Sequence, residues 1–151
     1  MRRTCLCVAA LAMLATSGTL LRGGGKEGDK ELKKIQGTWK FILQEMDGKE
    51  RPKEELTKLT ITFAGDKWSV RVEDKVVQAG THQLDGTKKP GQIDAVVTEG
   101  EDKGSTMLGI YELKGDKMKV CFDPKGKQRP TSFTSKTGQF AAVLEREKKK
   151  D

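Results

Sequence analysis

The sequence predicts an all-β fold: an antiparallel up-and-down barrel of about eight strands with one short helix. Apolar residues recur at every second position through most of the chain after residue 32, which is the pattern of half-buried strands. Turns that contain Gly, Asp or Pro separate these alternating runs. All four prolines lie outside the runs, as a hydrogen-bonded sheet requires, because proline has no backbone donor.

Length and composition limit the classes of protein to consider. The chain has 151 residues, of which 34% are hydrophobic and 34% charged, and this allows one modest domain. Much of the apolar content lies in the first two dozen residues, which excludes a polytopic membrane protein. Three cysteines are too few for a disulfide scaffold. A single histidine leaves little scope for histidine-based catalysis or for a metal site, so neither a metal nor a cofactor is expected.

Residues 1–17 have the pattern of a secretory signal peptide. Arg2 and Arg3 precede a long uncharged stretch, and Ala15-Thr16-Ser17 supplies small residues for cleavage. The mature protein is therefore expected to be extracytoplasmic, periplasmic or secreted, without stable membrane insertion. A retained anchor is the alternative, since about 18 uncharged residues just span a bilayer, but the polar end of the stretch disfavours it.

The segment at 18–31 is expected to be a flexible linker, because its glycines and charged residues have little to bury. A short helical lead-in over 30–35 is suggested by the spacing of Leu32 and Ile35. The barrel domain is predicted at 32–147, and a basic tail follows at 148–151.

The expected strands follow in order. The first, 38–45, places Trp39, Phe41 and Leu43 on one face. In the next two strands, 58–63 and 68–73, apolar and polar residues alternate most clearly. A helix at 52–57 precedes them, with Pro52 suited to its first turn. The remaining strands are predicted at 76–84, 92–98, 106–113, 117–122 and 140–146.

The connections favour a barrel over a sandwich. Most of them are short and hairpin-like, and only the one at 123–139 is clearly long. A Greek-key sandwich needs more long crossovers than this.

Three sequence blocks carry a resemblance to a known family. Gly37-Thr38-Trp39 matches the G-x-W motif of lipocalins, and Arg146 stands where that family has an arginine packed over the tryptophan. The stretches at 37–52, 108–116 and 119–133 are similar to a small lipocalin-like domain of unknown function abundant in planctomycete bacteria. The resemblance implies a calycin-type barrel and supplies no activity or catalytic residue.

The same resemblance implies a structural clasp formed by Gly37, Trp39 and Arg146. A guanidinium over an indole contributes about 0.5 to 2 kcal/mol and would join the first and last strands. This role is favoured over ligand contact for the three residues.

Two functions remain open for the barrel interior. One is a binding module that holds a small apolar or aromatic molecule. The other is a protein-interaction or structural domain whose interior is filled by its own side chains, with an unidentified protein partner. For His82, a satisfied core or rim position is favoured over ligand contact. The candidate ligand-binding residues are Phe41, Ile61, Phe63, Trp68, Val70, His82, Tyr111 and Phe122.

Catalysis and nucleic-acid binding are not expected. The serines and carboxylates form no pattern of acid, base and nucleophile, so the chain is not predicted to be an enzyme. Its lysines are scattered among acidic residues instead of forming a basic stripe. Cys121 is expected to point outward near Lys117 and Lys119, which would lower its pKa. An inert, half-covered thiol is favoured there over a mixed disulfide.

Overall fold

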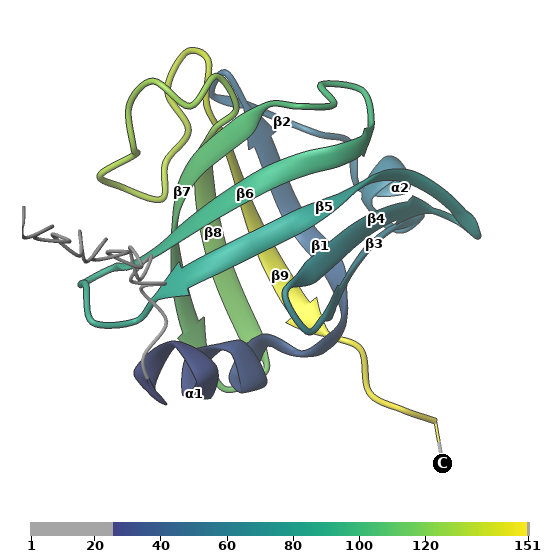
Figure 1. The fold of residues 1–151 in the computed structure, drawn as a ribbon. Helices are drawn as coiled ribbons and strands as arrows, with labels where there is room; N and C mark the ends of the chain where they lie inside the picture. Colours follow the sequence, from purple (N-terminus) through teal and green to yellow (C-terminus); the bar gives the residue numbers. More distant parts are fainter. Residues whose placement is uncertain (1–25, 151) are drawn as a thin grey trace, which may run out of the picture.

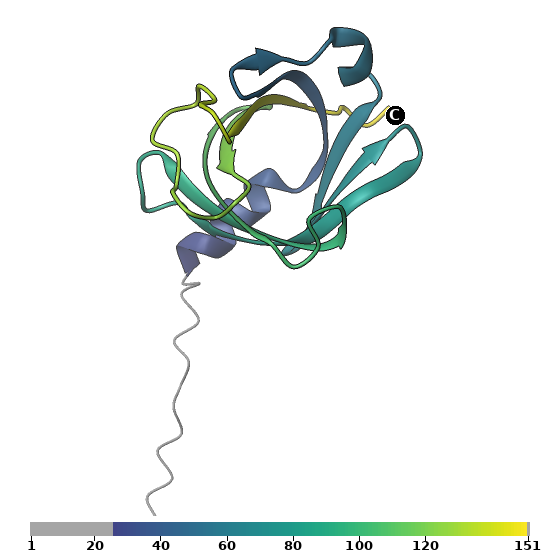
Figure 2. The ribbon, with the colours of Figure 1, turned by 90° about the horizontal axis from the view of Figure 1, so that it is seen from above.

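Eight antiparallel strands close into a barrel in the computed structural model, which describes residues 26–150 (Figure 1). Each strand pairs with the next along the chain, and β1 also pairs with β9, which closes the ring seen in Figure 2. The predicted fold class is confirmed. The barrel strands are β1 (Gly37–Met46), β3 (Leu59–Ala64), β4 (Lys67–Val72), β5 (Lys75–Asp85), β6 (Gly91–Gly100), β7 (Thr106–Lys114), β8 (Lys117–Asp123) and β9 (Phe140–Arg146).

Two small elements lie between β1 and β3. The strand β2 (Lys49–Glu50) extends the end of β1 as a hairpin, and the sequence did not indicate it. The helix α2 (Lys53–Leu56) follows Pro52, and the short helix predicted there is confirmed. Its Leu56 is buried, which fixes the helix against the barrel wall.

A bulge in β1 changes which of its side chains point inward. Phe41 pairs with Leu144 but Leu43 pairs with Val143, so Ile42 is an extra residue in the strand. Leu43 therefore leaves the face that it was expected to share with Trp39 and Phe41. The inward positions after the bulge belong to Gln44 and Met46.

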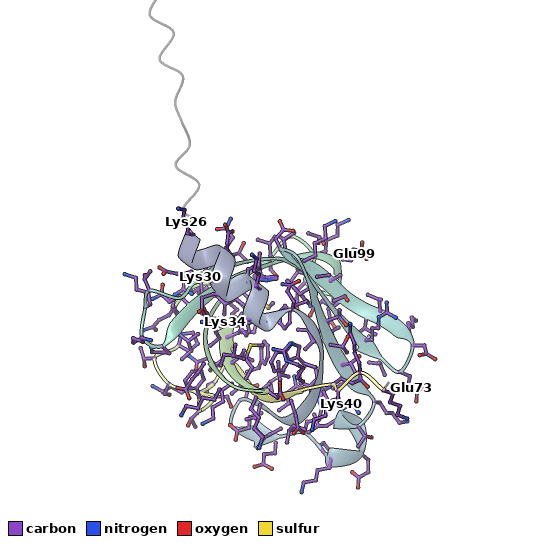
Figure 3. All side chains as sticks on the ribbon, turned by 90° about the horizontal axis from the view of Figure 1, so that it is seen from below. Lys26, Lys30, Lys34, Lys40, Glu73 and Glu99 are labelled. Atoms are coloured by element: carbon purple, nitrogen blue, oxygen red, sulfur yellow. The ribbon has the colours of Figure 1, made fainter. Side chains whose placement is uncertain are left out.

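The helix α1 (Lys26–Ile35) crosses one end of the barrel, as Figure 3 shows from below. It begins within the segment expected to be a flexible linker, so that expectation is wrong for 26–31. Ile35 is buried in the core, and its carbonyl accepts a 2.8 Å hydrogen bond from Trp39 Nε1. The barrel thus stabilises a helix that is too short to form alone. The proposed signal peptide lies outside the described residues.

The connection at 124–139 packs on the outside of the barrel. Its Phe133 packs against a second, smaller cluster formed by Ile110, Cys121 and Ala141. Cys121 does lie on the outer face, but it is buried beneath this connection. Burial raises the pKa of its thiol, aided by the Glu45 carboxylate, so the expectation of a lowered pKa is wrong.

Within residues 26–150, no helix has the length and apolar character needed to cross a bilayer.

Candidate functional site

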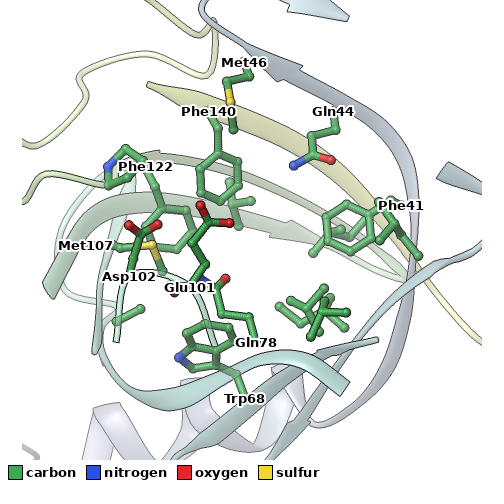
Figure 4. A pocket seen from close by; sticks show the side chains of 18 of the residues that line it. Phe41, Gln44, Met46, Trp68, Gln78, Glu101, Asp102, Met107, Phe122 and Phe140 are labelled. Atoms are coloured by element: carbon green, nitrogen blue, oxygen red, sulfur yellow. The ribbon is translucent and has the colours of Figure 1, made fainter. Parts of the chain in front are cut away.

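A cavity of about 370 Å³ lies in the end of the barrel opposite α1 (Figure 4). Its inner wall is apolar and comes from strands all around the ring. Exposed residues such as Met46, Val72 and Val77 also line it, so the cavity opens to the surface. Six of the eight predicted ligand-binding residues line this one cavity: Phe41, Ile61, Phe63, Trp68, Val70 and Phe122.

The other two predicted residues lie outside its lining. His82 packs edge-on against Phe63, with ring centroids 5.3 Å apart and an interplanar angle of 79°. Tyr111 lies against α1, where its hydroxyl donates a 3.0 Å hydrogen bond to Glu31 Oε2. Burial and this carboxylate raise the pKa of Tyr111, which stays protonated at neutral pH. Both residues therefore contribute to the closed end of the barrel.

Trp68 is held in a fixed position on the cavity wall. Its Nε1 donates a 3.1 Å hydrogen bond to the Thr81 carbonyl on β5. The ring also lies close to Gly80, where an added Cβ would stand 2.9 Å from the indole and 1.8 Å from the Val96 carbonyl oxygen. Glycine is needed there because only a residue without a side chain allows the indole and β6 to approach together.

The opposite wall carries two stacked aromatic rings. Phe122 on β8 and Phe140 on β9 have centroids 5.2 Å apart and an interplanar angle of 18°. Together with Trp68 and Phe41 they line the cavity with flat apolar surfaces. Such surfaces suit an apolar or aromatic molecule, since aromatic rings stack in offset or edge-on arrangements.

The sequence did not predict the polar part of the lining. Gln44 enters the cavity because of the bulge at Ile42, and periodicity alone gives no sign of a bulge. Gln78 and the turn between β6 and β7 supply further polar groups at the mouth. The polar residues of the lining are Gln44, Arg51, Gln78, Glu101 and Asp102.

The residues of the expected clasp meet at the closed end of the barrel. The Arg146 guanidinium carbon lies 4.2 Å from the Trp39 ring centroid. Its Nη2 donates a 2.5 Å hydrogen bond to the Lys34 carbonyl, and its Nη1 donates to the Gln36 carbonyl. Gly37 has φ +113°, a conformation that favours glycine. Arg146 thus ties β9 to β1 and also to the carboxyl end of α1.

Among the residues that the structure describes, no three His, Cys, Asp or Glu side chains gather in a way that would hold a metal ion. Comparison of the chain with protein-family models, with curated proteins and with solved structures gives no match.

Proposed function

We propose that this chain is an exported, non-catalytic, lipocalin-like binding module that holds one small apolar or aromatic molecule in the mouth of the barrel. The observation that carries the proposal is the cavity of about 370 Å³, open at one end and lined largely by apolar side chains. Small-molecule sites are concave and mostly apolar, with volumes of roughly 300 to 1,000 Å³. An eight-stranded barrel is wide enough to hold one such molecule.

The uneven filling of the barrel supports a ligand. At the α1 end, large side chains such as Ile35, Trp39 and Met118 are buried almost completely. At the mouth, Phe41, Ile61 and Val70 are only partly buried, although they pack against the same core cluster. Covering this apolar surface would contribute about 25 cal/mol for each Å² removed from water.

A fluorescent apolar probe tests the proposal. N-phenyl-1-naphthylamine should bind the protein saturably with one site, and its binding should change tryptophan emission because Trp68 lines the cavity. The variant Val70→Phe places a larger side chain in the cavity and should weaken binding at least about tenfold.

Val96→Phe is the matched control for this test. Val96 is exposed and is not part of the cavity lining, so the same substitution there should leave probe affinity unchanged. Urea unfolding of both variants shows whether they are folded. If neither this probe nor any member of a panel of fatty acids, aromatic compounds and pigments binds, the proposal of a binding module is wrong. The alternative, a protein-interaction or structural domain, then replaces it.

Export is tested separately. Amino-terminal sequencing of the protein recovered from its native host should show the loss of residues 1–17. Recovery of soluble protein that still begins at Met1 would contradict export.

A further inference from the structure

We infer that the cavity selects flat, fused-ring aromatic molecules over alkyl chains and over saturated rings. The inference rests on the proposed function and narrows its ligand class. It comes from the rings of the lining and from the way in which the strands hold them. The chain has five phenylalanines, two tryptophans and one tyrosine, and five of these eight side chains line the cavity.

The lining rings come from strands on different sides of the barrel. They are Phe41 on β1, Phe63 on β3, Trp68 on β4, Phe122 on β8 and Phe140 on β9. In Figure 4 the labelled rings of Phe41, Trp68 and the stacked pair of phenylalanines lie around the cavity. A ligand in this space therefore contacts ring surfaces on more than one side.

Two of these rings lean onto the barrel wall because a glycine stands opposite each of them. Trp68 pairs directly with Gly80 on β5, and Phe122 pairs directly with Gly109 on β7. A Cβ added at Gly80 would stand 2.9 Å from the indole, and one added at Gly109 would stand 2.4 Å from the Phe122 ring. Each ring thus takes the space of the missing side chain and lies over the neighbouring strand. This arrangement explains how a wall rich in rings still leaves a cavity.

The cavity spans the barrel but does not run through it. Every barrel strand contributes to the lining, and the buried side chains of Ile35, Trp39 and Met118 fill the end under α1. A long alkyl chain must therefore fold inside the cavity or leave part of its length in water, and a flexible ligand also loses more rotational freedom on binding. A cavity of about 150 Å³ admits benzene, so one of about 370 Å³ has room for roughly two or three fused rings.

Three ten-carbon alcohols test the ligand class. They are the flat aromatic 2-naphthol, the saturated bicyclic decahydro-2-naphthol and the linear 1-decanol, and each is neutral at pH 7 with one hydroxyl group. Calorimetric titration of the full chain should give the tightest binding for 2-naphthol. We expect about tenfold over decahydro-2-naphthol, because contacts between rings add to the effect of area burial. Burial alone predicts a different order, with 1-decanol tightest, since it carries the most apolar surface.

The double variant Phe41→Leu, Phe140→Leu removes two rings and keeps apolar side chains in the lining. Both positions are only partly buried, so the barrel should stay folded, which urea unfolding checks. The preference for 2-naphthol over decahydro-2-naphthol should fall to within about threefold. If the double variant is unfolded, each single variant is titrated in its place and should lower the preference at least about twofold.

Phe133→Leu is the matched control for these variants. Phe133 packs against the smaller cluster on the outside of the barrel and is not part of the cavity lining. The same loss of a ring at this position should leave the preference for 2-naphthol unchanged.

The outcomes separate the inference from the proposed function. Equal affinities for the three alcohols, or tightest binding of 1-decanol or decahydro-2-naphthol, overturn the aromatic class and leave the binding module standing. A preference for 2-naphthol that survives the loss of the two rings also overturns it, and so does an equal loss of affinity for all three alcohols. Failure of 2-naphthol to bind, while N-phenyl-1-naphthylamine or a member of the wider panel binds, overturns the inference alone. Failure of every one of these compounds overturns both.

Discussion

His82, one of the eight candidate ligand contacts, is a core residue in the structure. It is 3% exposed, and neither ring nitrogen has a hydrogen-bond partner in the described part of the chain. Burial disfavours the charged ring and lowers the pKa of His82 to about 4, although the Asp66 carboxylate acts in the opposite direction. The ring is neutral at pH 7 and packs against Phe63 as part of the core.

This lowered pKa predicts a loss of stability in mild acid. Between pH 6.5 and about 4, His82 is protonated in the unfolded chain but neutral in the folded one, so the unfolded state binds more protons. The free energy of unfolding should fall as the pH decreases through this window, by up to about 3 kcal/mol from this residue. Urea unfolding at several pH values should show a flatter profile for His82→Leu. Parallel profiles for the two proteins would argue that His82 is not responsible.

The contact between Trp39 and Arg146 predicts a coupled effect on stability. Trp39 is completely buried, so Trp39→Ala should reduce the free energy of unfolding by about 3 to 5 kcal/mol. Arg146→Ala should cost less, because part of the side chain is exposed and its ion pair with Asp116 is at the surface.

In the double variant, the two losses should be non-additive by about 1 kcal/mol, since the guanidinium and the indole are in contact. Chemical denaturation of the two single variants and the double variant measures this coupling. Strictly additive losses would show that the contact contributes nothing.

Among the larger elements, the connection at 124–139 is ordered by two anchoring side chains. The Asp123 carboxylate accepts hydrogen bonds of 2.8 to 3.0 Å from the amides of Lys125, Lys127 and Gln128. Burial alone would raise the pKa of Asp123, but these donors outweigh it and the pKa is lowered. Arg129 donates to the carbonyls of Ile93 and Gly109, which binds the connection to the sheet.

This packing predicts that Phe133 protects Cys121 from reagents. In Phe133→Ala, the cover of the smaller cluster is incomplete, and the Cys121 thiol should react with iodoacetamide at least several-fold faster. Mass spectrometry of the labelled peptides distinguishes Cys121 from Cys5 and Cys7. Phe140→Ala serves as the control, because Phe140 packs on the inner face of the same sheet. An equal increase in both variants would indicate general loosening.

Periodicity predicted elements whose stability depends on one buried face, and it missed those held by specific contacts. Every predicted barrel strand is present. In β3, for example, apolar Ile61 and Phe63 alternate with polar Thr60 and Thr62, and this alternation of side chains indicates which face of the strand is buried. The first two turns of α1 have no such pattern. That helix depends on contacts with residues distant in the sequence, such as the hydrogen bond that the Tyr111 hydroxyl donates to Glu31.

At the scale of the whole molecule, the barrel has a filled end and an open end, and only part of this division could be predicted. The aromatic and branched residues of the cavity wall follow from inward alternation, and six of the eight predicted positions lie there. Sequence does not show how far along each strand the filling extends. Tyr111 and His82 are inward too, but they lie at the end that α1 covers.

Two methionines give a matched test of this division. Met118 is 1% exposed and lies outside the cavity lining, whereas Met107 is 9% exposed and lines the cavity. Met118→Ala should leave an enclosed void and cost about 2 to 5 kcal/mol, the usual range for such truncations. Met107→Ala removes atoms that border space already open to solvent, so it should cost less, by at least about 1 kcal/mol.

The Met107→Ala variant should also admit a bulkier probe, whereas Met118→Ala should leave probe binding unchanged. Urea unfolding and probe titration measure both quantities. Equal losses of stability would mean that the mouth is packed as tightly in solution as the end under α1, and that the interior does not divide in two.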